Sequence, residues 1–167
     1  ALTTAQVIAT ASRPETDQWV RQLGAHYVLN HRNALADELK KTGLSSLTHV
    51  ASLNQTDQHF ADIVKMLEPQ GKLALIDTPT QPLDILSMKQ KSLSLHWEFM
   101  FTRAFFETDD MIQQHHILSR VAELVDSRVV KSTLQQHFGV INAANLKKAH
   151  RFIESNSSIG KVVLEGF

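Results

Sequence analysis

The chain has 167 residues, with 17 Lys or Arg balanced by 17 Asp or Glu, 43% hydrophobic residues and no cysteine. A globular chain of this length and composition buries enough apolar surface to fold without a metal or a disulfide. The lack of cysteine excludes disulfide frameworks, thiolate zinc sites and cysteine nucleophiles. The balanced charge argues against a nucleic-acid partner, and no apolar run is long enough to cross a bilayer. We therefore expect a cytoplasmic protein with neither nucleic acid nor a membrane as its partner.

Short apolar runs alternate with segments of helical spacing through the first half of the chain. Strands are predicted at residues 7–11, 26–30, 47–53 and 72–77, and helices at residues 14–23, 34–41 and 56–67. Ser12 and Glu15 have the spacing of a capping box for the first helix, and Asn33 is positioned to cap the second. The repeated strand and helix units predict an α/β fold, a parallel sheet with helices on both faces.

The second half of the chain follows a looser pattern. A short helix is predicted at residues 85–91, a strand at 93–101, a long helix from Thr108 to about Asp126, a strand at 132–140, a helix at 142–155 and a final strand at 161–164. The strand at 93–101 is rich in aromatic residues, and two acids follow Thr108, as suits a helix N-terminus.

Motifs for metal or nucleophilic chemistry are weak in this sequence. The neighbouring His115 and His116 would point about 100° apart on a helix, so they cannot share a metal ion well. His49 and His96 lie within apolar runs, where a hydrogen-bonded structural histidine is the simpler interpretation. No serine lies in a Gly-x-Ser-x-Gly elbow, so nothing supports a hydrolase. The sequence therefore predicts no metal site.

The residues that follow the first predicted strand carry more information. Ser12 and Arg13 stand there, and no Asp or Glu ends the strand. In dinucleotide-binding sheets an acid at this place binds the adenosine ribose of NAD, whereas a hydroxyl and an arginine suit the 2′-phosphate of NADP. A helix cap beside a solvated arginine also explains these residues. Spacing alone leaves both interpretations open.

Five segments, in this order and at these distances, carry a resemblance to a known family: VIATASRPET from Val7, QLGAHYVLNHR from Gln22, EPQGKLALID from Glu68, KSLSLHWEFMFTR from Lys91 and SIGKVVLEGF from Ser158. They look like the C-terminal part of the medium-chain dehydrogenase/reductase superfamily, in its quinone oxidoreductase and zinc-type alcohol dehydrogenase-like branch. The resemblance covers essentially the whole chain. Its most specific segment begins at Lys91, where a strand, an aromatic pair and an arginine recur together.

The resemblance implies a Rossmann-like fold that is incomplete in this chain. Relatives have a catalytic domain, a first nucleotide-binding strand and a Gly-x-Gly-x-x-Gly turn before the segment that matches Val7, whereas the six glycines here are isolated. Residues 1–126 are expected to form a partial dinucleotide-binding domain, and residues 127–167 to return to the catalytic domain. We expect this chain to be a fragment of a longer enzyme, inactive alone and without measurable NADPH binding.

The absent first strand would leave the strands at 7–11 and 47–53 on either side of an open position in the sheet. Unpaired backbone groups are costly when they are buried, so we expect this position to close. Either the two strands pair directly, or another segment of the same or another chain fills the position. The final strand at 161–164 is one candidate.

The resemblance also implies a set of cofactor-binding residues: Ser12, Arg13, His31, Leu53, Asn54, Ile76, Asp77, Phe99, Met100 and Lys161. Ser12, Arg13 and His31 match the corner that binds the adenosine phosphate of NADP(H). The pairs at 53–54 and 76–77 end strands from which relatives contact the cofactor. Phe99 and Met100 match the backbone beside the nicotinamide, and Lys161 matches a basic position near the cofactor. The zinc ligands of some relatives would lie outside this chain, so no zinc is expected in it.

The implied activity is hydride transfer between NADPH and a small carbonyl, enone or quinone substrate, with the cofactor carrying the chemistry. No catalytic residue is assigned, because the group that polarises the substrate would come largely from the catalytic domain. The strand at 93–100 pairs with its twofold mate in relatives, so a homodimer through this strand is expected. The alternative is a non-enzymatic α/β binding or interaction domain, for which the same pattern of strands and helices would suffice.

Overall fold

The computed structural model describes residues 2–166, which divide into two compact units. The first unit is Gln6–Gln114, and the second joins the N-terminal residues up to Ala5 with the segment after Gln114. Among the described residues, no helix is long and apolar enough to cross a membrane.

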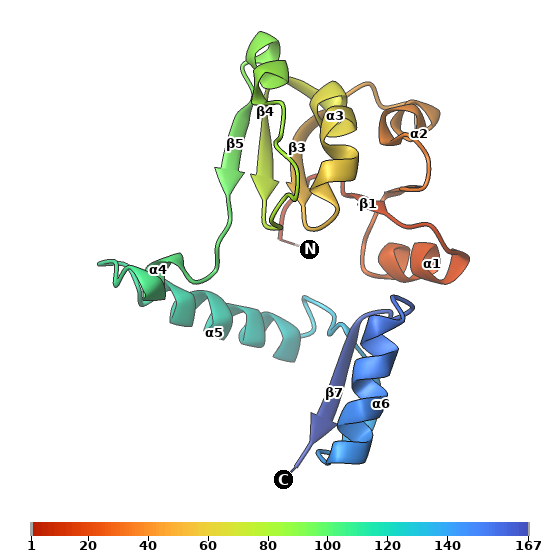
Figure 1. Ribbon diagram of the computed structural model, residues 1–167, viewed down its shortest axis with the longest axis vertical. Coiled ribbons are helices and arrows are strands. Elements are labelled where there is room, and N and C mark those ends of the chain that lie inside the picture. Colours follow the sequence, from red (N-terminus) through yellow and green to blue (C-terminus); the bar gives the residue numbers. More distant parts are fainter. Residues whose placement is uncertain (1, 167) are drawn as a thin grey trace. The chain divides into compact units, whose positions relative to one another are not determined.

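The first unit alternates strands and helices in the predicted order (Figure 1). Its elements are β1 (Ile8–Thr10), α1 (Pro14–Gln22), β2 (Tyr27–Leu29), α2 (Leu35–Lys41), β3 (Leu47–Ser52), α3 (Thr56–Met66), β4 (Leu67–Leu75), the 3-10 helix η1 (Ile85–Lys91), β5 (Ser94–Trp97) and α4 (Thr102–Phe105). Helix α5 (Gln113–Asp126) begins at the end of this unit and continues into the second. The second unit also contains β6 (Leu134–Val140), α6 (Ala143–Glu154) and β7 (Lys161–Glu165).

The strand pairs of the described chain are parallel, as predicted for an α/β fold. β1 pairs with β2, and β3, β4 and β5 form a separate sheet in that order. In the Rossmann strand order 3-2-1-4-5-6, β1 and β2 match strands 2 and 3, and β3, β4 and β5 match strands 4, 5 and 6. The two observed sheets are therefore the ones expected on either side of strand 1. The register places Ser52, Leu75 and Trp97 in one row, so β3, β4 and β5 end together.

The expected closure of the sheet between β1 and β3 is not seen. The two strands belong to separate sheets, and β7 pairs with β6 in the second unit. The reason for the β7 pairing is local, because β6, α6 and β7 form one βαβ unit in which Leu134 aligns with Lys161. Direct pairing of β1 with β3, and insertion of the final strand, are therefore both wrong for the described residues.

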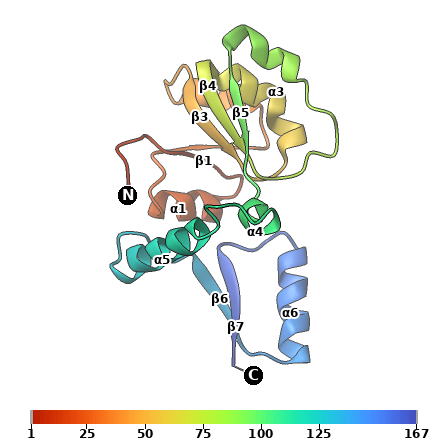
Figure 2. The same ribbon diagram turned by 90° about the vertical axis from the view of Figure 1, so that its left-hand side faces the viewer.

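The core of the first unit lies where α2 and α3 pack on the strands. Its buried side chains are Leu29, Leu35, Leu39, Phe60, Ile63, Val64, Met66, Leu67, Leu73 and Met88. Helix α3 supplies Phe60, Ile63 and Val64 at helical spacing, so one of its faces is apolar and turns inward. Figures 1 and 2 show α3 lying against one face of the sheet that β3, β4 and β5 form.

Helix α1 begins differently from the prediction. Its N-cap is Arg13 and not Ser12. The Thr16 hydroxyl accepts a hydrogen bond from the Arg13 N–H at 3.2 Å and donates to the Arg13 carbonyl at 2.9 Å. The predicted capping box of Ser12 and Glu15 is therefore wrong, because Thr16 satisfies the backbone of the N-cap residue one position further along.

Two strands have different lengths from their predicted bounds. β4 begins at Leu67 rather than at Lys72, because Leu67 pairs with Leu47 of β3. β5 ends at Trp97, so the aromatic segment after it forms a turn and the short helix α4, which the pattern did not predict. Pairing with a neighbouring strand decides these bounds, and the apolar pattern does not record it.

Lys91 at the end of η1 fixes the end of α3. Its ammonium group donates to the carbonyls of Val64, Lys65 and Leu67 at 2.9, 2.8 and 2.6 Å. The last carbonyls of a helix have no partner within the helix, and the helix dipole favours a cation beside them. The connection between β4 and β5 is thereby attached to α3.

The second unit is built on one βαβ element, with α6 connecting the parallel strands β6 and β7 (Figure 2). The Asn142 side chain accepts a hydrogen bond from the Asn145 N–H at 2.8 Å, as an N-cap does at the start of α6. Gly160 precedes β7 with a φ of +67°, and a Cβ there would lie 2.3 Å from the Thr133 carbonyl oxygen. Glycine alone fits this approach of two backbone segments.

Candidate functional site

Six of the predicted cofactor-binding residues lie where β3, β4 and β5 end. They follow the aligned strand ends as the pairs Leu53 and Asn54, Ile76 and Asp77, and Phe99 and Met100. The four apolar side chains of this set are exposed, from 43% for Ile76 to 68% for Leu53. Ligands of parallel sheets bind outside the carboxyl ends of the strands, so this edge is the candidate nicotinamide end of a cofactor site.

The Asp77 carboxylate binds the start of α3 at this edge. One of its oxygens accepts the Thr56 N–H at 3.1 Å, and the other accepts the Thr56 hydroxyl. Thr56 is fully buried, and its hydroxyl also lies 2.7 Å from the Ser52 hydroxyl. A carboxylate is stabilised at a helix N-terminus, where N–H groups have no partner within the helix. Asp77 therefore joins the ends of β3 and β4 to α3.

Asp57 holds the loop that follows β4. One of its oxygens accepts the Thr80 N–H at 2.8 Å and the Thr80 hydroxyl at 2.7 Å, and the other accepts the Gln81 N–H at 3.3 Å. These bonds lower the pKa of Asp57, with the Thr80 hydroxyl as the largest cause. The carboxylate thus stays ionised and keeps the loop attached to the first turn of α3.

The other predicted corner lies where β1 and β2 end. These strands pair with Thr10 opposite Leu29, and continuing the register places Ser12 level with His31. Arg13 follows as the N-cap of α1, and all three predicted residues of this corner are partly buried. The structure therefore brings Ser12, Arg13 and His31 to one corner.

Glu38 of α2 holds the turn after β2 at both of its ends. It accepts the Asn30 N–H at 3.2 Å and the Asn33 side-chain amide at 3.0 Å. Asn30 closes the turn itself, since its side chain accepts the Arg32 N–H and its carbonyl accepts the Asn33 N–H, both at 3.0 Å. The predicted cap of α2 by Asn33 is wrong, because Ala34 occupies the N-cap and Glu38 takes the Asn33 amide.

The pKa of His31 is lowered, first by burial and then by the positive charges of His59 on α3 and of Arg32. The imidazole is therefore mostly neutral at pH 7. A phosphate dianion beside it would offset the neighbouring charges and favour the protonated imidazole.

Lys161, the tenth predicted residue, is exposed at the start of β7 in the second unit. The structure defines its place in that unit only, so its role toward a cofactor stays a prediction.

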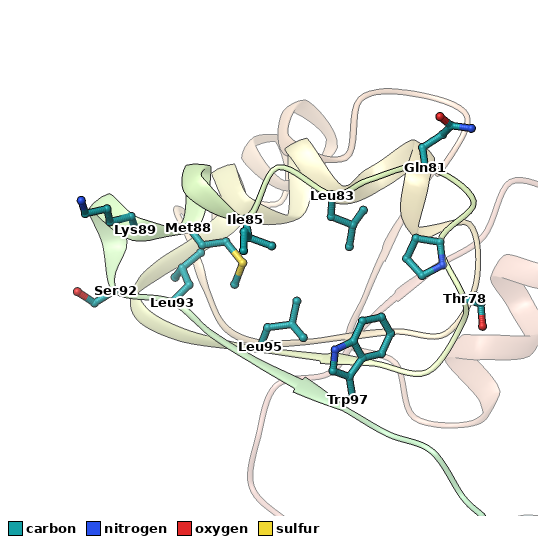
Figure 3. A pocket seen from close by; sticks show the side chains of 11 residues that line it. Thr78, Gln81, Leu83, Ile85, Met88, Lys89, Ser92, Leu93, Leu95 and Trp97 are labelled. Carbon is teal, nitrogen blue, oxygen red and sulfur yellow. The ribbon is translucent and has the colours of Figure 1, made fainter.

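An apolar pocket of about 690 Å³ lies between β5 and the connection from β4. It is lined by Thr78, Pro79, Gln81, Leu83, Ile85, Met88, Lys89, Ser92, Leu93, Leu95 and Trp97. Figure 3 shows Met88, Leu95 and Trp97 facing the cavity, whereas Lys89 extends its amine away from it. The lining that faces the space is therefore apolar, and Trp97 is 62% exposed.

Sequence reasoning missed Glu38, Thr56 and Asp57, which hold these loops, and His59, which lowers the pKa of His31. Their bonds join positions that are 8 residues apart for Glu38 and Asn30, 21 for Thr56 and Asp77, and 23 for Asp57 and Thr80. A local pattern contains no signal for such pairs. Asp57 and Glu38 had a local signal, as acids in the first turn of a helix.

Comparison with known proteins places this arrangement in a family. Residues 23–164 match the family model of the zinc-binding dehydrogenases. The chain belongs to this family. Its place in the zinc-type alcohol dehydrogenase-like branch of the medium-chain dehydrogenase/reductase superfamily, and its Rossmann-like α/β fold, are confirmed.

The chain spans about half the length of the relatives it matches. A zinc-type alcohol dehydrogenase-like protein of Staphylococcus aureus (strain MSSA476) is 33% identical over 158 residues, which are 95% of this chain and 47% of that protein. A structure from Rhizobium etli CFN 42, described as a proposed zinc-dependent alcohol dehydrogenase, is 48% identical with a TM-score of 0.92, covering 99% of this chain and 48% of that one. A mycobacterial protein solved with NADPH shares the fold, with 21% identity and a TM-score of 0.74 over 96% of this chain and 49% of that one.

The family name implies zinc, and the side chains that the structure describes include no group that fits a zinc site. Among residues 2–166, no three His, Asp or Glu side chains are grouped to hold a metal ion, and the sequence has no cysteine. Zinc in proteins is bound by sets of three or four such side chains.

Proposed function

We propose that this chain is the cofactor-binding part of an NADPH-dependent oxidoreductase of the zinc-type alcohol dehydrogenase-like branch. The reaction is hydride transfer between NADPH and a small carbonyl, enone or quinone. The observation that carries the cofactor choice is the pair Ser12 and Arg13 after β1, where NAD-binding sheets have an acid. Membership of a dehydrogenase family favours this proposal over a binding domain without enzymatic activity.

The corner after β1 and β2 has the charges that a 2′-phosphate requires. A guanidinium group binds phosphate oxygens through paired N–H donors, and a serine hydroxyl donates one more bond. Arg32 adds a fixed cation in the adjoining turn, and His31 adds an imidazole whose protonation a bound phosphate would favour. The first residues of α1 follow Arg13 directly, so the positive end of the helix dipole also favours an anion here.

The edge formed by β3, β4 and β5 suits the other end of the cofactor. Nicotinamide supplies the hydride when the cofactor is bound. Asp77 and Asp57 hold α3 and the loop after β4 in place, so the residues beside Ile76 keep a fixed position. The exposed Phe99 and Met100 give this edge an apolar surface that excludes water from a flat ring and from an apolar substrate. We assign no catalytic residue in this chain.

Substrate polarisation is assigned to the part of the enzyme outside residues 1–167. The chain spans about half the length of the relatives it matches. We propose that a catalytic domain outside this chain polarises the substrate. Residues 127–167 are proposed to return to that domain. The apolar, aromatic segment Phe99–Phe101 favours a small substrate with an apolar body, such as an enone or a quinone.

Titration of the full-length protein with NADPH and NADH tests the proposed cofactor. We expect NADPH to bind about 10-fold to 100-fold more tightly, which is the value of one charge-assisted phosphate contact. Quenching of tryptophan fluorescence gives both dissociation constants. Equal affinity for the two cofactors, or tighter binding of NADH, would contradict the proposal. Residues 1–167 alone serve as a negative control, because they contain no Gly-x-Gly-x-x-Gly turn for the pyrophosphate.

We also propose that the full-length protein forms a homodimer through β5. Among the described strands, β5 pairs with β4 alone, so its outer edge has free N–H and C=O groups. A twofold axis that relates two antiparallel strands is perpendicular to their sheet, so paired residues lie on the same face. Leu93, Leu95 and Trp97 line one pocket, and pairing would therefore place both copies of this apolar set on one face.

Sedimentation of the full-length protein at micromolar concentration is expected to give a dimer. Trp97→Lys places a charge in the apolar face and is expected to shift the protein toward the monomer. Gln18→Lys adds the same charge on the exposed side of α1 and should leave the dimer intact. A monomeric wild-type protein would refute the dimer. Unchanged dimerisation of the Trp97 variant would show that the interface does not involve β5.

A further inference from the structure

Glu38 differs from the other charged residues of α2 in its surroundings. Its side chain is only 12% exposed, whereas the side chains of Asp37 and Lys41 are 67% and 68% exposed. Its carboxylate accepts the Asn30 N–H at 3.2 Å, the Asn33 side-chain amide at 3.0 Å and the Lys41 ammonium at 2.5 Å. These bonds lower the pKa of Glu38, with Lys41 as the largest cause. The carboxylate is thus ionised and held against the turn after β2.

The turn that Glu38 holds has His31 and Arg32 at its two central positions. Asn30 and Asn33 form its ends, and the Asn33 N–H donates to the Asn30 carbonyl at 3.0 Å. Glu38 binds both ends, so it fixes the direction in which the central residues leave the backbone. The β1–β2 register places His31 level with Ser12, beside the corner proposed for the 2′-phosphate.

We propose that Glu38 is a positioning residue that determines the preference for NADPH, by holding the His31–Arg32 turn toward the 2′-phosphate. This inference rests on the proposed NADPH-dependent function. It also assigns to Arg32 a second guanidinium contact to the phosphate. Arg32 is exposed, and its backbone is fixed by the bond from its N–H to the Asn30 side chain at 3.0 Å.

The charge of Glu38 gives this inference a discriminating test. A carboxylate near a phosphate repels it, so an effect of charge alone predicts that Glu38→Gln strengthens NADPH binding. Positioning predicts the opposite, because the amide of glutamine cannot accept the Asn30 and Asn33 hydrogen bonds together in the same arrangement. Lys41 already offsets the Glu38 charge at 2.5 Å, which reduces the repulsion that the variant would relieve.

The experiment measures dissociation constants for NADPH and NADH in the full-length protein. We expect Glu38→Gln to weaken NADPH about threefold to tenfold, the value of one or two lost hydrogen bonds, with NADH unchanged. Asp37→Asn is the matched control: it removes the same charge one residue away, from an exposed side chain bound to Lys40. It should leave both constants unchanged. Amide hydrogen exchange at 30–33 should become faster in the Glu38 variant and not in the control.

A second variant keeps the inference testable if Glu38→Gln fails to fold. Arg32→Gln changes an exposed side chain, retains the backbone bond to Asn30, and should weaken NADPH without affecting NADH. The inference is overturned if Glu38→Gln strengthens NADPH, leaves it unchanged, or weakens both cofactors equally. If the wild-type protein shows no preference for NADPH, the proposed function fails first and this inference fails with it.

Discussion

Replacing Arg13 by alanine in the full-length protein is expected to weaken NADPH binding by about 1.5 to 3 kcal/mol, the value of a hydrogen bond to a charged group. NADH binding should barely change, because NADH has no 2′-phosphate for the guanidinium to bind. Arg13 is the N-cap of α1, and the alanine variant retains its backbone bonds to Thr16. Fluorescence titration with both cofactors measures the difference.

A control on the same helix separates this effect from a general loss of positive charge. Arg21 lies in the last turn of α1, where it forms an ion pair with Asp17 at 2.7 Å. Arg21→Ala should leave both cofactor affinities unchanged. An equal loss of NADPH and NADH in Arg13→Ala would show that Arg13 is structural, or that it binds a part that the two cofactors share.

The order of strands and helices was predictable because it depends on residues that are close along the chain. The spacing of Phe60, Ile63 and Val64 predicts α3, and the structure buries all three side chains. Short apolar runs between turns predict parallel strands in the same way. The helix predicted at residues 142–155 is observed as α6, and its start is capped by the Asn142 side chain, which bonds the backbone three residues later.

Strand pairing was less predictable, because the partner of a strand is chosen in space. β4 begins five residues before its predicted start, since Leu67 pairs with Leu47 across the sheet. The sequence also suggested that β7 could lie between β1 and β3, but β7 pairs with β6, its neighbour across one helix. Apolar runs of similar composition do not say which strand they will join.

Some residues of the candidate site were predictable from the sequence and others were not, for the same reason. Ser12 and Arg13 could be singled out because they directly follow a predicted strand, at the place where a parallel sheet contacts its ligand. The groups that hold the site could not be, because Glu38 and Asp77 bond to residues on other elements. A carboxylate of this kind looks, in the sequence, like any solvated acid.

Replacing Asp77 by alanine is expected to destabilise the first unit by about 2 to 4 kcal/mol, because a buried N–H and a buried hydroxyl lose a charged acceptor. Both groups belong to Thr56, which is fully buried. The Thr56 hydroxyl retains Ser52 at 2.7 Å, whereas the Thr56 N–H has no replacement from the side chain of alanine. Asp77→Asn keeps one acceptor oxygen and should cost less. Urea denaturation of the three proteins gives the free energies of unfolding.

Asp77→Ala should also weaken cofactor binding at the edge formed by β3, β4 and β5, because Asp77 joins the strand ends to α3. The exposed Asp84, in the connection after β4, provides a matched control: Asp84→Ala removes a carboxylate from the surface and should change stability by less than about 0.5 kcal/mol. A double variant of Asp77→Ala with Thr56→Val should destabilise the protein by less than the sum of the two single changes, since both remove the bond between the Thr56 hydroxyl and Asp77. Full additivity would show that the bond between Asp77 and the Thr56 hydroxyl contributes little to stability.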